Sequence, residues 1–209
     1  MFGWLIEFMQ SFLIFLNDLV NNYGLAIIVF TLIVRFLLYP LTSKQTRSMK
    51  KMQDLQPEME KIKEKYEDDK QEQQKKMMEL YKENNVNPLA GCFPMILQLA
   101  ILIPLYRAIL DLEIGGGFLW MASLTEPDVA LVIINAVAMV GQTYVTSKIS
   151  GQNKQANKMM YFMPLFILVI GFQLPAGILV YWVTSTIFTV LQQYRLSQEP
   201  GSKEVVNNE

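Results

Sequence analysis

Residues Phe30–Thr42 read FTLIVRFLLYPLT, an apolar run that holds an arginine, Arg35, near its centre. The run lies in a longer apolar segment, Gly24–Leu41. That length is close to the roughly 20 helical residues needed to cross a bilayer core. Ionisable side chains inside such segments are costly and usually functional. The stretch therefore predicts a membrane-spanning helix with a candidate functional residue, although an arginine that snorkels to the interface and only anchors its helix is the alternative.

Four further segments are apolar enough to span a membrane. They are Leu89–Leu110, Val129–Ser147, Met159–Leu174 and Ala176–Gln192. With Gly24–Leu41 they predict an all-α integral membrane protein with five transmembrane helices.

The basic residues predict the orientation of these spans. Thr42–Pro88 holds 11 of the 18 Lys and Arg, Lys148–Lys158 holds three, and the tail after Tyr194 holds two. The loops on the opposite side hold none. Because basic loops stay in the cytoplasm, we expect the N-terminus outside and the C-terminus inside.

The first 23 residues predict an amphipathic helix on the outer leaflet. Polar residues recur every three to four positions, at Glu7, Gln10, Ser11, Asn17, Asp18, Asn21 and Asn22. Such spacing forms one polar stripe on a helix. No basic segment precedes the apolar part, which disfavours a cleaved signal peptide. A frayed hydrophobic terminus is the alternative.

The charged segment between the first two spans predicts a cytoplasmic helical hairpin. Apolar residues from Met49 to Tyr66 step by three or four, Glu67–Asp69 interrupt the pattern, and a second helix follows. A solvated hairpin that merely joins two spans would suffice. Its methionines instead favour a surface that accepts varied apolar partners. The candidate docking residues are Met52, Met59, Met77 and Tyr81.

The composition disfavours several classes of function. The chain has no His and one Cys, which excludes an internal disulfide and the usual zinc, haem and iron–sulfur sites. No phosphate-binding GxxxxGK[ST] loop is present. We therefore expect no metal, no cofactor and no enzymatic reaction.

Polar residues in the spans predict a hydrated cavity around Arg35. Thr31 and Tyr39 lie one turn to either side of Arg35 on the same helix face. The other spans contribute Gln98, Asn135, Gln142, Trp182, Thr184, Ser185, Thr186 and Thr189. Polar side chains in spans avoid lipid and face one another or water. With no acidic residue inside the spans, Arg35 would attract an anion or a carboxylate. These features alone also fit a small-anion transporter or channel, or a scaffold that recruits a cytoplasmic partner through the hairpin.

Three long runs resemble the YidC family of membrane protein insertases, within the Oxa/YidC/Alb superfamily. They are VRFLLYPLTSKQTRSMKKMQDLQPEMEKIKEKY, KMMELYKENNVNPLAGCFPMILQLAILIPLYRAI and MPLFILVIGFQLPAGILVYWVTSTIFTVLQQY. The resemblance implies an insertase and chaperone of the bacterial cell membrane that works without nucleotide hydrolysis. It further implies a five-span core with a hydrophilic groove open to the cytoplasm and to lipid.

The resemblance also implies roles for individual residues. Arg35 matches the groove arginine, Thr31 a substrate-contacting threonine, Gln142 a groove glutamine, and Tyr181 and Trp182 an aromatic pair. Asn135 and Ser185 complete the expected substrate groove, and the hairpin matches one thought to receive substrates or ribosomes. Implied partners are nascent membrane proteins, membrane lipids, the Sec translocon and the ribosome, with no direct readout of nucleic acid.

The expected domain organisation follows from these segments. It comprises an outer-face helix (1–23), the five-span core (24–41 and 89–192), the cytoplasmic hairpin (42–88) and a short cytoplasmic tail (193–209).

Overall fold

The computed structural model describes residues 3–87, 93–112, 116–150 and 168–198. The described residues form helices and no β-sheet, with one isolated bridge between Phe118 and Met121. The helices are α1 (Gly3–Val20), α2 (Tyr23–Asp54), α3 (Gln56–Lys65), α4 (Lys70–Glu83), α5 (Phe93–Asp111), α6 (Val129–Ser150) and α8 (Ala176–Gln198). The expectation of an all-helical protein is confirmed. Most of the expected span Met159–Leu174, and most of the expected tail, lie outside the described residues.

Three helices in the described part of the chain, α1, α2 and α6, are long and apolar enough to cross a membrane. Helices α5 and α8 contain 19 and 23 residues, and thus have a comparable length. By length and composition α1 also qualifies, although the sequence pattern predicts a helix that lies at the interface.

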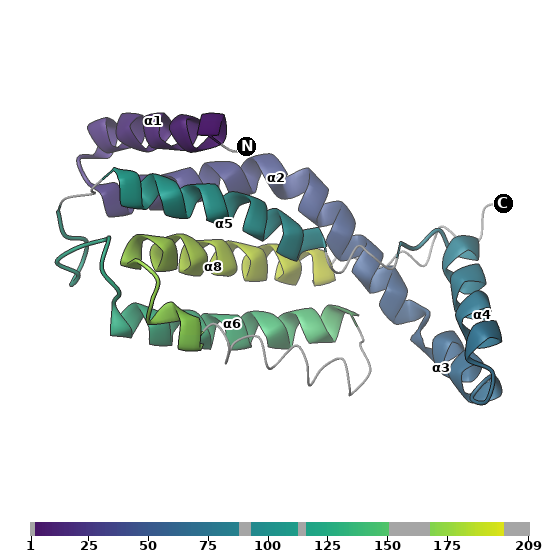
Figure 1. Ribbon diagram of the computed structural model, residues 1–209. Helices are drawn as coiled ribbons and strands as arrows, with labels where there is room; N and C mark the ends of the chain where they lie inside the picture. The colour runs from purple at the N-terminus through teal and green to yellow at the C-terminus, as the bar shows by residue number, and fades with distance from the viewer. Residues whose placement is uncertain (1–2, 88–92, 113–115, 151–167, 199–209) are drawn as a thin grey trace.

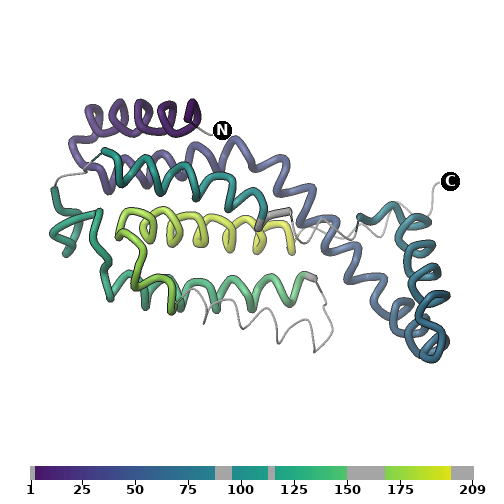
Figure 2. The backbone as a smooth tube through the Cα atoms, in the orientation of Figure 1, coloured from purple at the N-terminus to yellow at the C-terminus, as the bar shows by residue number. Residues whose placement is uncertain are grey.

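Helix α2 is one continuous helix from the bundle to the hairpin. Asn22 caps its start, because its side chain accepts a hydrogen bond from the Leu25 backbone N–H at 3.1 Å. The helix continues through Pro40, beyond the expected end of the span at Leu41. A proline inside a helix is tolerated where other groups form hydrogen bonds with the backbone groups that it leaves unpaired. Figure 2 shows the unbroken path of α2.

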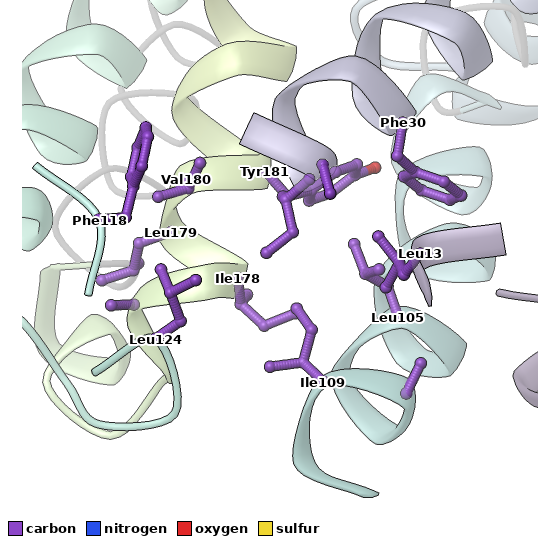
Figure 3. Close-up of a cluster of buried hydrophobic side chains, with 14 of the residues drawn as sticks. Leu13, Phe30, Leu105, Ile109, Phe118, Leu124, Ile178, Leu179, Val180 and Tyr181 are labelled. Atoms are coloured by element: carbon purple, nitrogen blue, oxygen red, sulfur yellow. The ribbon is translucent and has the colours of Figure 1, made fainter. Parts of the chain in front are cut away.

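Helix α8 lies at the centre of the bundle, between α2 and α6, and α1 packs on α2 and α5 (Figure 1). The first two turns of α8 are buried from Ala176 to Tyr181. Figure 3 shows their side chains meeting those of the neighbouring helices. Fully buried members of this core include Leu13, Ile27, Phe30, Leu105, Ile109, Leu124, Ile178 and Leu179. The core therefore fixes the rotation of α8, which positions the polar residues that follow.

Helix α1 has three faces. Met9, Leu13 and Leu16 are buried against the bundle. A polar stripe with Glu7 and Asp18 lies on a second face. The third face is apolar and exposed, with Trp4, Phe8, Phe15 and Leu19 between 58% and 70% accessible. A helix with both a packed and an exposed apolar face suits a position against lipid.

Helices α3 and α4 pack against each other at the far end of α2 (Figure 1). Their small core consists of Leu55, Leu80 and Val86, with Met52, Met59 and Ile62 packed against it. Asp69 caps α4 by accepting from the backbone N–H groups of Gln71 and Glu72. We call this α3–α4 unit the hairpin.

Candidate functional site

Arg35 of α2 is held by side chains from two other helices. Its Nε donates to Ser185 Oγ of α8 at 2.8 Å, and its Nη2 donates to the same oxygen. Nη2 also donates to Gln98 Oε1 of α5 at 2.9 Å. The guanidinium is partly buried. We call Arg35, Gln98, Tyr181 and Ser185 the arginine cluster.

The partners of Arg35 in the cluster are neutral. Among the described residues the salt bridges are Lys75–Glu72 and Lys76–Glu79, both in α4, and none involves Arg35. A hydroxyl and an amide oxygen solvate the guanidinium without neutralising it. The positive charge is therefore available to an anion that reaches the cluster.

Two polar atoms of the cluster, Gln98 Nε2 and Tyr181 Oη, are buried and form no well-formed hydrogen bond with the described residues. Tyr181 is 1% exposed, and its ring reaches from α8 toward α2 (Figure 3). Its hydroxyl lies near the charge of Arg35 and close to the polar side chains of Ser185 and Gln98. Buried donors without an acceptor are uncommon, and each one calls for an explanation.

The sequence-predicted residues Arg35 and Ser185 are thus in direct contact, with Tyr181 beside them. Thr31 is fully buried, and its hydroxyl donates to the Ile27 carbonyl of its own helix at 2.6 Å. Tyr39, the third member of the expected polar line, is 37% exposed. The line therefore runs from the core to the surface of α2, with Arg35 between the two.

The remaining predicted groove residues lie on α6 and α8. Asn135 of α6 is buried, and both of its side-chain polar atoms lack a hydrogen-bond partner in the described part of the chain. Gln142 and Trp182 are partly buried. Helix α6 packs on α8, so Asn135 belongs to the same bundle interior as the cluster.

Sequence reasoning placed Gln98 among the polar residues of the cavity around Arg35 but did not name it among the substrate-groove residues. Its contact with Arg35 depends on the rotation of α5, which periodicity does not define. Gln192 and Gln193 were also missed. Gln192 Nε2 donates to Thr42 Oγ1 at 2.8 Å and to Ser43 Oγ at 3.0 Å, and Thr146 Oγ1 donates to Gln193 Oε1 at 3.1 Å. These contacts tie α2 and α6 to the last turns of α8.

The candidate docking residues of the hairpin divide into two groups. Met52 and Met59 pack on the hairpin core, and the Tyr81 hydroxyl donates to Met59 Sδ at 3.8 Å. Partial burial raises the pKa of Tyr81 above its ordinary value. Met77 instead lines a surface cavity of about 390 Å³ together with Lys63, Gln73, Gln74 and Met78.

Known proteins resemble this chain over most of its length. The family model described as "60Kd inner membrane protein" matches residues 15–203. A relative from Fusobacterium nucleatum, named membrane protein insertase YidC, is 40% identical over 201 residues, which cover 92% of this chain and 96% of that protein. A relative of the same name from Caldanaerobacter subterraneus is 42% identical over 194 residues, with coverages of 92% and 93%.

A solved structure is also similar. It is titled "Active YidC insertase crystal structure with the first transmembrane domain resolved" and matches with a TM-score of 0.75 at 32% identity. The match covers 92% of this chain and 46% of that chain, so this chain spans about half the length of the solved protein.

Proposed function

The chain belongs to the 60Kd inner membrane protein family, that of the YidC membrane protein insertases, and we propose that it helps newly made membrane proteins enter the bilayer and fold there. The observation that carries the proposal is the arginine cluster, in which a partly buried guanidinium is bound by neutral groups alone among the described residues. A permanent charge held in this way is suited to receive an acidic segment in transit.

The proposed arrangement is a multi-pass protein of the bacterial cell membrane with five spans. Its N-terminus lies outside, and its hairpin and C-terminus lie in the cytoplasm, as the distribution of basic residues favours. Helix α1 lies along the outer leaflet, with Trp4, Phe8 and Phe15 in the lipid interface and its polar stripe toward water.

In this proposal the hydrophilic outer segment of a substrate leaves the cytoplasm and rests in a hydrophilic groove around Arg35. The groove opens to the cytoplasm and to lipid. Arg35 attracts acidic groups, while Thr31, Asn135, Gln142 and Ser185 offer polar contacts that replace lost water. Neither the Nδ2 nor the Oδ1 of Asn135 forms a hydrogen bond with another described residue, which supports such a role.

The apolar segment of the substrate then leaves the groove along Trp182 and the lipid-facing side of the bundle. Its transfer into lipid supplies the driving force, at about 25 cal/mol per Å² of apolar surface. The protein lowers the barrier for the hydrophilic segment, so neither nucleotide hydrolysis nor a cofactor is required.

The hairpin is proposed as the first contact of the substrate or the ribosome. Met77 and Met78 border the surface cavity, and flexible thioethers adapt to varied apolar segments. Nascent membrane proteins and membrane lipids are the proposed partners, with the Sec translocon and the ribosome as further ones.

A small-anion transporter is the second candidate, because a guanidinium that forms no salt bridge with the described residues also suits a small anion. The two candidates differ in what crosses the membrane. Purified protein in sealed liposomes would receive a single-span substrate, synthesised outside, and protease protection of the translocated tail would be recorded. Protection above the level of empty liposomes is expected. Chloride flux without any protection would instead favour the transporter.

A further inference from the structure

Arg35 has two acceptors in the cluster, and they are not equivalent. Ser185 Oγ accepts from both Nε and Nη2, and Ser185 is 1% exposed. Gln98 Oε1 accepts from Nη2 alone and shares that nitrogen with Ser185. Ser185 is therefore the firm partner of Arg35, and Gln98 is the weaker one.

Gln98 has one well-formed hydrogen bond among the described residues, the bond that its Oε1 accepts from Arg35. Its Nε2 is buried without a well-formed partner there, and the amide otherwise interacts with the Tyr181 hydroxyl. A carboxylate is a stronger acceptor for a guanidinium than a neutral amide oxygen. A carboxylate that reaches the cluster would replace Gln98 at Nη2 and leave Ser185 in place.

The geometry points to Gln98 as the residue that sets the selectivity for acidic segments: it occupies Nη2 of Arg35 at rest and yields that position to a substrate carboxylate. This inference rests on the proposed function and deepens it. The neutral amide keeps the guanidinium oriented but not neutralised. Tyr181 Oη lies beside Arg35, Ser185 and Gln98 but has no well-formed hydrogen bond among the described residues, so it is a donor that the incoming carboxylate can satisfy.

The inference predicts opposite effects for two substitutions at one position. Gln98→Glu has nearly the same shape and places a permanent carboxylate where the substrate's would bind, so an acidic tail must compete with it. Gln98→Met has a similar length but no acceptor, so the tail binds without competition. Both changes should affect a tail that carries amides less than a tail that carries acids, because an amide oxygen is a weaker acceptor for the guanidinium than a carboxylate.

The test uses the full chain in sealed liposomes and one single-span substrate whose outer tail carries either three aspartates or three asparagines. The half-saturating substrate concentration is read from protease protection. For the aspartate tail we expect an increase of about tenfold in Gln98→Glu and a decrease of about threefold in Gln98→Met. For the asparagine tail we expect shifts in the same directions but of less than about twofold, because an amide oxygen is the weaker acceptor. Gln198→Glu, which adds the same charge at an exposed position at the end of α8, is the matched control and should change neither value.

Thermal unfolding in detergent shows whether each variant folds. If Gln98→Glu does not fold, the decrease in Gln98→Met with the aspartate tail alone carries the test. Equal shifts for the two tails, or no shift in a folded variant, would overturn the inference while leaving the proposed function intact. Wild type that protects neither tail would overturn the proposed function itself.

Discussion

In the bundle Arg35 lies among neutral partners, whereas in the hairpin lysines and glutamates line exposed helix faces. Lys76 and Glu79 illustrate the second case, with Nζ and Oε2 at 2.7 Å on the surface of α4. Solvent and salt screen such pairs, so they contribute little. Arg35 is partly buried, and away from water each added or removed charge has a larger effect. Function in the bundle thus depends on single residues, and function in the hairpin on a surface.

The largest expected effect comes from adding a side chain at a glycine of the bundle that has no room for one. Gly24 of α2 is buried, and a Cβ at this position would lie 2.1 Å from Cγ of Phe118. Gly24→Ala should lower the free energy of unfolding by about 3 kcal/mol, measured by unfolding in detergent micelles. Gly141→Ala is the control, because a Cβ there meets nothing within 4 Å. Equal stability of the two variants would show that the bundle is not packed as described.

A cavity in the hairpin should have a smaller and local effect. Leu80 of α4 is 7% exposed and packs in the hairpin core with Leu55 and Val86. Leu80→Ala should destabilise α3 and α4 by about 2 kcal/mol, seen as faster amide hydrogen exchange there. The exposed Met78→Ala serves as the control. Faster exchange in α8 as well would contradict the separation of hairpin and bundle.

The geometry of Arg35 can be separated from its charge by Arg35→Lys. The lysine ammonium keeps the charge but lacks the planar guanidinium, whose nitrogens donate to both Ser185 and Gln98. Insertion of an acidic-tailed substrate should slow about threefold, the worth of one net hydrogen bond. Arg107→Lys, at an exposed position of α5, should have no effect. An Arg35→Lys rate equal to wild type would mean that the fork has no role.

The smallest effect is expected for the surface pair of the hairpin. The hydrogen bond from Lys76 lowers the pKa of Glu79 and raises that of Lys76. The stabilisation is present above the ordinary pKa of a glutamate and is lost as the pH falls through the lowered pKa of Glu79. Because both groups are exposed, Lys76→Ala should leave the melting temperature at pH 7 unchanged, as should Lys75→Ala. A drop of several degrees would refute the view that hairpin charges are individually dispensable.

The sequence predicted the helical class and the family, because apolar periodicity and long motifs record both. It also indicated that Arg35 and Ser185 belong to one site, since polar side chains in spans tend to meet. The acceptors of Arg35 depend on how α5 and α8 are rotated about their axes, and no local pattern encodes that rotation. For this reason Gln98 was not named among the substrate-groove residues.

In two places a side chain predicted to contact substrate has a partner within the protein, and a sequence pattern does not reveal that partner. The Thr31 hydroxyl bonds to its own helix, an option open to any threonine in a helix. Met59 and Tyr81 contact each other within the hairpin, although both fit an exposed docking surface by spacing. Their assignments to substrate contact, like those of the remaining groove residues, stay predictions.

The account depends most directly on Arg35 as the element that recognises acidic segments. The decisive measurement compares the insertion rates of the aspartate-tailed and asparagine-tailed substrates in liposomes with wild type and with Arg35→Ala. We expect wild type to favour the aspartate tail by about tenfold, the worth of one charge-assisted hydrogen bond, and Arg35→Ala to insert both tails at the same rate. A preference for the aspartate tail that survives in Arg35→Ala would contradict the account.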